Sequence, residues 1–421
     1  MNNKVFSPGS ILLPKSGTDM TKWSVVACDQ YTSEPEYWSA VSDFVGDAPS
    51  TLHLTFPEIY LEDGDTSSRI SNINETMLSY INNGIFSDAA AKYIYLERVQ
   101  RDGKVRHGIM GVVDLEEYDY MPGSQSKIRA TEGTVLERIP PRVKIRENAH
   151  MEIPHIMLLI DDSEKSVIEP LADAKSTLDV AYDFSLMQDS GKICGYFVNE
   201  SEEARIDAAL AALADQSAFD KKYGVSGKGV LQFAVGDGNH SLATAKECWR
   251  KIKETLPESE HSSHPARYAL CELVNLHDPA LEFEAIHRVV FDVDADDMYN
   301  KLSEYYEITD DAEQVFDMIT KTGVRRIGIG NPKSNLTVGS LQKFIDDYIK
   351  ENGGRVDYIH GEEVVLRLGS QDKNVGFILP TIAKSDLFPT VIRDGVLPRK
   401  AFSMGHAWDK RFYLEARIIK K

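Results

Sequence analysis

The chain has 421 residues, of which 42% are hydrophobic and 27% charged, an ordinary globular composition with room for two or three domains. Its formal net charge of −19 and pI of about 5.1 argue against nucleic acid or an anionic membrane as a partner. The four cysteines lack CxxC spacing and the N-terminus lacks an apolar signal core. We therefore expect a soluble, cytoplasmic protein that acts on a small molecule, with its oligomeric state open.

The first third of the chain predicts both strands and helices. Residues 24–28 are strand-like and are followed by Asp29 and Gln30, which either face a site or begin a loop. A capping box of Ser33 and Glu36 predicts the start of a helix. Residues 52–60 are predicted as a strand and 67–83 as a helix. The runs 93–99 and 105–115 flank Asp102-Gly103 and predict a hairpin, so the sheet is not purely parallel.

A basic segment follows at residues 127–146, in a chain that is otherwise acidic. Its cations are Lys127, Arg129, Arg138, Arg142, Lys144 and Arg146. Arginine side chains bind phosphate or carboxylate with two parallel hydrogen bonds, so the segment either contributes to an anion site or pairs with the protein's own acids at its surface. Pro140-Pro141 favours an extended or turning backbone over a continuous helix.

The stretch 230–249 carries the densest concentration of chemistry. An apolar run at 230–235 predicts a buried strand, and the apolar residues 242–249 predict a helix. Between them lies the segment Gly236-Asp237-Gly238-Asn239-His240-Ser241. The glycines permit a sharp turn, Asn239 or Ser241 can cap the helix, and the helix N-terminus suits an anion. Asp237 and His240 can move protons. The alternative is a turn whose histidine merely packs.

The remainder of the chain predicts further strands and a small subdomain. Strands are expected at 153–160, 268–274 and 281–291, and a helix at 202–216. His287-Arg288 is either a buried pair with carboxylate partners or part of a site. Helices at 295–305, 312–320 and 341–350 alternate with strands at 324–329, 355–359 and 375–379. This pattern predicts a main domain (1–291), a small α/β subdomain (292–382) and a C-terminal segment (383–421) that returns to the main domain and ends in a strand at 411–419.

Several common signatures are missing from the sequence. There is no Walker A motif, no GxGxxG that opens a helix, no GxSxG elbow and no HExxH. No upstream Asp-x-His accompanies the Gly-Asn-His segment, which argues against a two-metal phosphoesterase. His261 and His264 lack partners at ligand spacing, and we expect no protein metal site.

Four blocks of the sequence resemble the bacterial domain-of-unknown-function family 1015. They are Gly236 to Ser241, Thr131-Glu-Gly-Thr134 with Arg142, Leu276 to Leu281 with His287-Arg288, and Leu397 to Ser403. Where the family has Asp-Gly-His-His-Arg, this chain has Asn239 in place of a histidine and Ser241 in place of the arginine. Losing that arginine removes a phosphate ligand. Either Arg142, Arg146 or Lys400 supplies the charge instead, or a nucleotide is not the phosphate donor.

The central block is also similar to the ParB/sulfiredoxin superfamily, which includes free-serine kinases. That similarity implies Asp237 as the base on a serine hydroxyl, His240 as a substrate contact and Glu132 as an assisting carboxylate. It further implies ADP or ATP as nucleotide and Mg²⁺ bridging the phosphates, although no motif here is dedicated to either. Substrate and phosphate contacts are expected from Gly238, Asn239, Ser241, Thr134, Arg142, Arg146, His287, Arg288 and Lys400.

Taken together, the sequence predicts an α/β fold with α+β character. We expect a mixed-sheet core with a ParB/sulfiredoxin-like site unit, and a smaller α/β subdomain. The favoured function is phosphoryl transfer on a small hydroxylated metabolite or its phosphate ester, with serine or phosphoserine as substrate. The alternative is a non-catalytic switch protein that binds a nucleotide or metabolite. The phosphate donor, reaction direction, exact substrate, metal dependence and pathway remain open.

Overall fold

The computed structural model describes residues 4–61, 66–87, 90–134 and 136–420, which fall into two compact units. The larger unit contains residues 1–130, 134–281 and 406–421, and the smaller contains 131–133 and 282–405. The sequence placed its boundaries at 291/292 and 382/383, whereas the units divide at 281/282 and 405/406. The strand at 283–291 belongs to the smaller unit because it pairs with strands of that unit.

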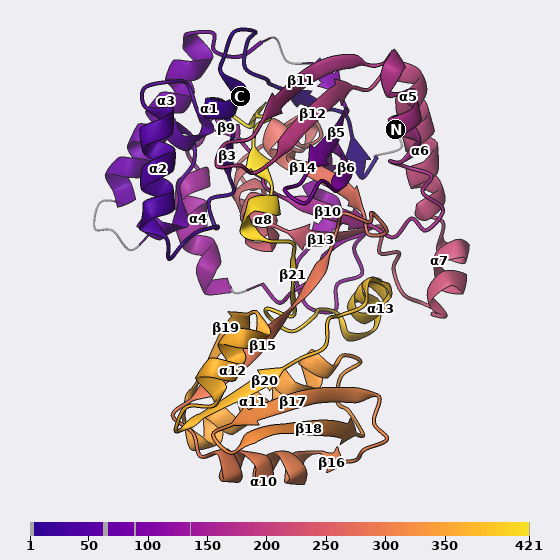
Figure 1. Ribbon diagram of the computed structural model, residues 1–421. Helices are drawn as coiled ribbons and strands as arrows, with labels where there is room; N and C mark the ends of the chain where they lie inside the picture. Colours follow the sequence, from indigo (N-terminus) through magenta and orange to yellow (C-terminus); the bar gives the residue numbers. More distant parts are fainter. Residues whose placement is uncertain (1–3, 62–65, 88–89, 135, 421) are drawn as a thin grey trace. The chain divides into compact units, whose positions relative to one another are not determined.

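The larger unit is built on a mixed sheet of ten strands among the described residues (Figure 1). The main path runs β11-β12-β5-β6-β14-β10-β13-β8-β7, with β1 paired to β6. The strand bounds are β1 Phe6–Ser7, β5 Ile94–Val99, β6 Val105–Asp114, β7 Tyr118–Asp119, β8 Ile128–Ala130, β10 Met157–Ile160, β11 Asp179–Ser185, β12 Lys192–Phe197, β13 Phe233–Asp237 and β14 Tyr268–Asn275. Parallel β10·β14, β13·β8 and β7·β8 pairs combine with antiparallel neighbours, which confirms the predicted mixed α/β class.

Both faces of this sheet are buried. On β5, Tyr95 enters one apolar core while Ile94 and Leu96 enter the other, as the two-residue period of a strand requires. The helices of this unit are α1 Met20–Trp23, α2 Pro35–Val45, α3 Thr66–Asn82, α4 Ile139–Arg146, α5 Pro170–Ala174, α6 Glu200–Leu213, α7 Gln216–Tyr223, α8 Asn239–Lys253 and α9 Glu258–His261. Residues of α2 and α3 pack into one core and residues of α6 and α8 into the other.

The C-terminal segment, residues 406–421, joins the larger unit through short strand pairs. β22 (Phe412–Tyr413) pairs with β3 (Val25–Val26), and β23 (Arg417–Ile418) pairs with β9 (Met151–Glu152). A further small sheet joins β2 (Gly9–Ile11) to β4 (Ala90–Lys92). The predicted return of the C-terminus as a single strand at 411–419 is therefore wrong in detail, because the segment forms two separate pairs.

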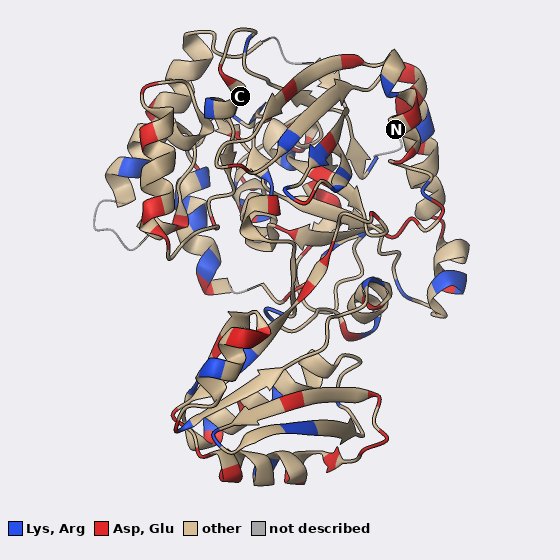
Figure 2. Cartoon of the chain, viewed as in Figure 1, with Lys and Arg blue, Asp and Glu red and all other residues tan. Residues whose placement is uncertain are grey.

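Buried charges hold this segment in place. Figure 2 shows charged residues on the central strands of the larger unit, among which Glu272 of β14 is fully buried. Arg411 Nη1 lies 2.6 Å from Glu272 Oε2, and its Nη2 contacts Glu415. Arg106 Nε lies 3.4 Å from Glu272 Oε1. Gly108 leaves space for this carboxylate, since a Cβ at that position would lie 2.9 Å from Glu272 Oε1.

A second buried carboxylate, Glu152 of β9, holds the last strand. Arg417 Nη2 lies 2.6 Å from Glu152 Oε1, and Arg146 at the end of α4 contacts Glu152 Oε2 at 2.5 Å. Burial acts to raise the pKa of both carboxyl groups, but neighbouring arginines outweigh it. Arg106 and Arg411 hold the pKa of Glu272 below its usual value, and Arg417 and Arg146 do the same for Glu152.

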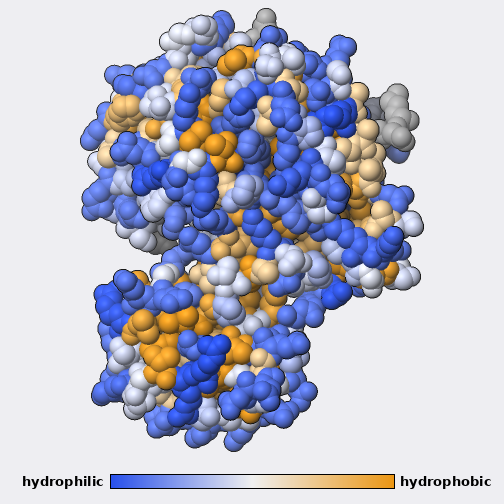
Figure 3. Space-filling view, turned by 45° about the vertical axis from the view of Figure 1, so that its right-hand side comes forward, coloured by the Kyte–Doolittle hydropathy of each residue, from blue (hydrophilic) through white to orange (hydrophobic). Residues whose placement is uncertain are grey.

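The smaller unit contains an antiparallel sheet with the order β16-β18-β17-β20-β15-β19, and β21 pairs with β15. Its strands are β15 Phe283–Phe291, β16 Glu307–Ile308, β17 Gln314–Thr320, β18 Gly323–Gly330, β19 Arg355–His360, β20 Asn374–Ile378 and β21 Phe402–Met404. Its helices are α10 Ala295–Tyr305, α11 Thr337–Asn352, α12 Glu362–Gly369 and α13 Lys384–Asp394. Figure 3 shows apolar side chains gathered on one side of this unit. Two of its large hydrophobic side chains are exposed, Val324 of β18 and Leu366 of α12.

Four local predictions are wrong. In the predicted helix 312–320, residues Gln314–Thr320 form the strand β17, because Phe316 and Met318 are buried and the segment pairs with both β18 and β20. Residues 52–60 form two 3₁₀ turns, η1 (Thr51–His53) and η2 (Glu58–Tyr60), and not a strand. The segment with Pro140-Pro141 is helical, since proline fits the first turn of α4. Ser33 does not cap α2, whose N-cap residue is Glu34.

Other predictions are confirmed. β5 and β6 form the expected antiparallel hairpin, and α3, α10 and α11 occur where helices were predicted. No helix among the described residues is long and apolar enough to cross a membrane.

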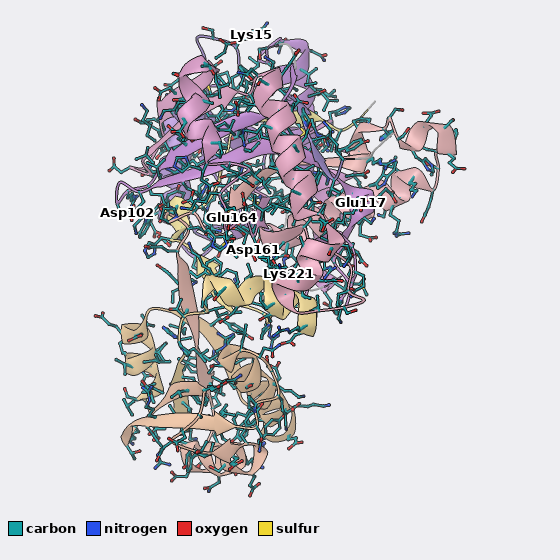
Figure 4. All side chains as sticks on the ribbon, turned by 90° about the vertical axis from the view of Figure 1, so that its right-hand side faces the viewer. Lys15, Asp102, Glu117, Asp161, Glu164 and Lys221 are labelled. Atoms are coloured by element: carbon teal, nitrogen blue, oxygen red, sulfur yellow. The ribbon has the colours of Figure 1, made fainter. Side chains whose placement is uncertain are left out.

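We predict that Glu272→Gln lowers the free energy of unfolding by about 3–5 kcal/mol, because it removes the buried negative charge that pairs with both Arg106 and Arg411 and leaves only Glu415 to pair with Arg411. Urea denaturation measures this loss. The matched control is Glu164→Gln, a change at an exposed glutamate labelled in Figure 4, which should shift stability by less than about 0.5 kcal/mol. Equal effects of the two substitutions would contradict the structural role of Glu272.

We also predict an acid-sensitive fold. A carboxyl group whose pKa is lower in the folded than in the unfolded chain stabilises the fold above its unfolded pKa, about 4.3 for glutamate. That contribution disappears as the pH falls through the lower folded value. Because Glu272 and Glu152 both have lowered pKa values, urea midpoints should fall steeply below about pH 4. A midpoint that stays constant from pH 6 to pH 3 would contradict this expectation.

Candidate functional site

Asp237 is the last residue of β13, and Gly238 turns the chain directly into α8. Gly238 has φ 78° and ψ 27°, the left-handed conformation that glycine adopts without penalty. A Cβ at this position would also lie 3.0 Å from the Cα of Ile156. No side chain caps α8, so the predicted cap by Asn239 or Ser241 is wrong. Instead Asp237 Oδ1 accepts a hydrogen bond from the Gly238 N–H at 2.9 Å.

A cation from the C-terminal segment pairs with Asp237. Lys410 Nζ lies 3.2 Å from Asp237 Oδ2, with 13% of the lysine side chain and 23% of the aspartate side chain exposed. The pairing of β22 with β3 places Lys410 beside Asp237. The pairing continues one residue beyond the strands, where the Arg411 carbonyl accepts a hydrogen bond from the Ala27 N–H, and Lys410 is the residue before Arg411. The acid and its cation are thus 173 positions apart in sequence (410 minus 237).

His155 reaches the site from the start of β10. Since β10 runs antiparallel to β13 and Met157 pairs with Asp237, the residues just before β10 lie beside the end of β13. His155 is buried, with Nδ1 2.8 Å from the Tyr413 hydroxyl and Nε2 3.1 Å from Ser241 Oγ. The Tyr413 hydroxyl oxygen also accepts a hydrogen bond from the Cys28 N–H at 3.1 Å.

A second carboxylate, Asp29, lies in the same region. Burial acts to raise its pKa, but the charge of His155, a hydrogen bond from Gln30 and the charge of Lys410 hold the pKa below its usual value. Burial and the charge of Asp29 raise the pKa of the neighbouring Cys28 thiol, which is therefore protonated at neutral pH. Of the two sequence alternatives for Asp29, the structure favours a place beside the site.

The predicted site residues fall into both units. Asp237, Gly238, Asn239, His240 and Ser241 are contiguous in the larger unit, where the His240 carbonyl accepts a hydrogen bond from the Thr244 hydroxyl at 2.7 Å. Thr134 also belongs to the larger unit. Arg142 and Arg146 lie on α4, which packs against α8.

Both of these α4 arginines are paired with acids. Arg142 contacts Glu58, and Arg146 contacts Glu152. Neither acid is a fully exposed surface residue, since the Glu58 side chain is 22% exposed and that of Glu152 is 3% exposed. Two other cations of the basic segment also have partners. Lys127 lies 3.5 Å from Glu117, and the buried Arg129 donates hydrogen bonds to the carbonyls of Ser126 and Gly229.

Four other predicted residues belong to the smaller unit. Glu132 forms a parallel bridge with Leu397, next to the hydrogen bond from Leu397 N–H to Thr131 O. Arg288 is fully buried and donates to Gln342 and to the carbonyls of Ile286, Arg399 and Lys400. His287 Nδ1 accepts from the Leu379 N–H at 3.1 Å. The hydrogen bonds of Arg288 thus go to an amide oxygen and to carbonyl oxygens in place of the expected carboxylate. A common site of Glu132 with Asp237 stays a prediction.

The sequence did not identify His155, Lys410 or Tyr413. Each lies in a short segment without a recognisable motif and becomes a neighbour of Asp237 or Ser241 only through strand pairing. The single sequence feature that could have drawn attention to His155 is its position directly before a buried strand.

A cavity of about 160 Å³ opens beside His155. Its lining includes Ser241 and Thr244 of α8, Arg142 and Arg146 of α4, and Cys28 and Tyr413. The described residues contain no group of three or more His, Cys, Asp or Glu side chains that could hold a metal ion.

Comparison with known proteins places the chain in a family. The model described as "Protein of unknown function (DUF1015)" matches residues 12–347, so the chain belongs to this family, as the sequence blocks predicted. No curated protein matches the sequence.

Similar solved structures are distant. They include a free serine kinase in complex with ADP, with 10% identity and a TM-score of 0.38 over 75% of this chain and 93% of that one. A conserved hypothetical protein from Pyrococcus furiosus has 12% identity and a TM-score of 0.35 over 75% and 96% of the two chains. SbnI with a C-terminal truncation, from Staphylococcus aureus, has 9% identity and a TM-score of 0.37 over 70% and 82%.

We predict that Gly238→Ala destabilises the protein by about 1–2 kcal/mol from left-handed strain alone, and by more because the new Cβ meets Ile156. The control is Gly224→Ala. Gly224 also has positive φ (61°), but a Cβ there would meet no atom within 4 Å. The difference in unfolding free energy between the two variants measures the contact, and equal losses would show that the turn is not closely packed against β10.

Proposed function

We propose that the protein transfers a phosphoryl group to or from a small hydroxylated metabolite, with serine and phosphoserine as the first candidates. The observation that carries this proposal is the Asp237 carboxylate, which lies at the glycine turn before α8 and is paired with Lys410 at 3.2 Å. Phosphoryl transfer depends on positioning and charge neutralisation more than on covalent chemistry of the protein. The proposal includes the cytoplasmic location expected from the sequence.

The start of α8 supports the binding of an anion. The first N–H groups of a helix have no partner within the helix, and its dipole adds positive potential. No side chain caps this helix, and Asp237 accepts a hydrogen bond from the Gly238 N–H. Lys410 adds a formal positive charge beside it. Anionic oxygens near α8 would therefore meet both backbone donors and a cation.

In the kinase direction, the substrate hydroxyl gives its proton to Asp237 as its oxygen bonds to phosphorus. The bond from phosphorus to the leaving oxygen of ATP or ADP breaks, and the electron pair departs with the nucleotide. In the phosphatase direction, water attacks the phosphate ester and the metabolite hydroxyl is released. A bound Mg²⁺ would neutralise phosphate charge in such a transfer, although the described residues contain no group of three or more His, Cys, Asp or Glu side chains that could hold it. His240 is assigned to substrate contact, and Glu132 stays the predicted assisting carboxylate.

We predict that Asp237→Asn keeps the fold and substrate binding but lowers turnover about 10²–10⁴-fold, because asparagine cannot accept the proton. His240→Ala should raise KM more than it lowers kcat. Turnover is followed by ³¹P NMR with Mg²⁺ and either ATP or ADP plus serine, or with phosphoserine alone. Asp183→Asn is the matched control, since it breaks another Asp–Lys pair, 2.7 Å from Lys192, outside the site.

Three outcomes separate the alternatives. Loss of turnover in a folded Asp237→Asn protein supports the proposal. Near-normal turnover in that variant removes Asp237 from the mechanism. Nucleotide or metabolite binding by the wild-type protein without any turnover would favour the switch protein over the enzyme.

A further inference from the structure

The cavity beside His155 is mostly apolar, although it adjoins a site of charged groups. Its lining contains many large hydrophobic side chains, among them Leu54, Phe56, Met77, Ile145, Met151 and Ile153. These residues come from the N-terminal turns, α3, α4 and the segment before β10. The cavity therefore lies among elements that are otherwise packed into the core of the larger unit.

The charged side chains that border the cavity have partners within the protein. Arg142 pairs with Glu58, and Arg146 pairs with the buried Glu152, which also binds Arg417. Burial keeps the Cys28 thiol uncharged by raising its pKa. An uncharged apolar group in the cavity would leave both pairs intact.

One wall of the cavity is polar and belongs to the candidate site. His155, Ser241 and Tyr413 all line it and are joined by the hydrogen bonds at His155 Nδ1 and Nε2. His155 also acts electrostatically on Asp29, and its ring lies against Gly238, where a Cβ would be 3.5 Å from His155 Cδ2. Asp237 does not line the cavity, but Ser241 does and lies in the first turn of α8, so an apolar group in the cavity would lie beside the turn that follows Asp237.

We propose that this cavity binds an apolar substituent of about six carbon atoms on the ligand whose polar end occupies the Asp237 site. The volume supports that size, since an engineered apolar cavity of about 150 Å³ in another protein binds benzene. Resting on the proposed function, this inference names the substrate class: a hydroxylated metabolite or phosphate ester that carries an aliphatic or aromatic group. Free serine would leave the cavity unfilled.

The test measures binding of straight-chain alcohols from 1-propanol to 1-hexanol to the full-length protein. Burial of each added methylene should tighten Kd about fourfold until the cavity is filled. With methyl-labelled methionine, the ε-methyl NMR signals of Met77 and Met151, which line the cavity, should shift on titration. The signal of Met298, in α10 of the smaller unit, should not.

A cavity-filling variant provides the control. Ala149→Leu adds three carbons at a lining position and should abolish the dependence on chain length. Ala211→Leu makes the same change at an exposed position of α6 and should bind as the wild-type protein does. If Ala149→Leu does not fold, the alcohol titration of the wild-type protein still tests the inference by itself. Equal affinity across the alcohols, or shifts absent from Met77 and Met151, would overturn the inference.

The alcohol titration measures binding and requires no turnover, so a negative result can be distinguished from a failure of the proposed function. Chain-length-dependent binding by a protein that transfers no phosphoryl group supports the cavity as a ligand site and rejects the enzyme. Transfer to free serine without any dependence on chain length supports the enzyme and overturns the cavity inference.

Discussion

The buried contact between Arg411 and Glu272 is the constraint on which the candidate site depends. Glu272 lies on β14 in the middle of the main sheet, and Arg411 comes from the last sixteen residues of the larger unit. Buried ion pairs contribute little net stability once desolvation is counted, but removing one partner is costly. The ion pair of Arg411 fixes the position of its neighbours in the chain. Lys410, which precedes Arg411, pairs with Asp237, and Tyr413 of β22, which follows it, contacts His155.

The site is consequently assembled from four distant pieces of chain. β13 supplies Asp237, the segment before β10 supplies His155, the loop after β3 supplies Asp29, and the C-terminal segment supplies Lys410 and Tyr413. Each piece is held by strand pairing or by a buried charge, so the groups are positioned before any ligand arrives. Preorganised charges of this kind are what phosphoryl transfer requires of a protein. Under the proposed function, the apolar cavity beside His155 would select substrates by their substituents.

Sequence patterns predicted those parts of the fold that local chemistry determines. The strand–turn–helix around Asp237 and the hairpin of β5 and β6 are dictated by residues next to one another, and both occur. β17 was missed because helix-compatible residues, Ala312 to Gln314, precede a segment whose strand conformation comes from pairing with β18 and β20. Lys410 could not be inferred, since nothing near it in sequence reveals that β22 pairs with β3. The predicted side-chain cap of α8 is wrong for a similar reason, because the Ser241 hydroxyl contacts His155, a residue of a distant segment, and not the backbone of its own helix.

A crystal structure of the protein soaked with phosphoserine, and separately with ADP and serine, would show directly whether the turn at Asp237 binds a phosphate group. We expect density for a phosphate group within hydrogen-bond distance of the first N–H groups of α8 and of Lys410, with the serine oxygen beside the Asp237 carboxylate. Phosphate density elsewhere in a well-ordered crystal, with the turn at Asp237 occupied only by water, would contradict it.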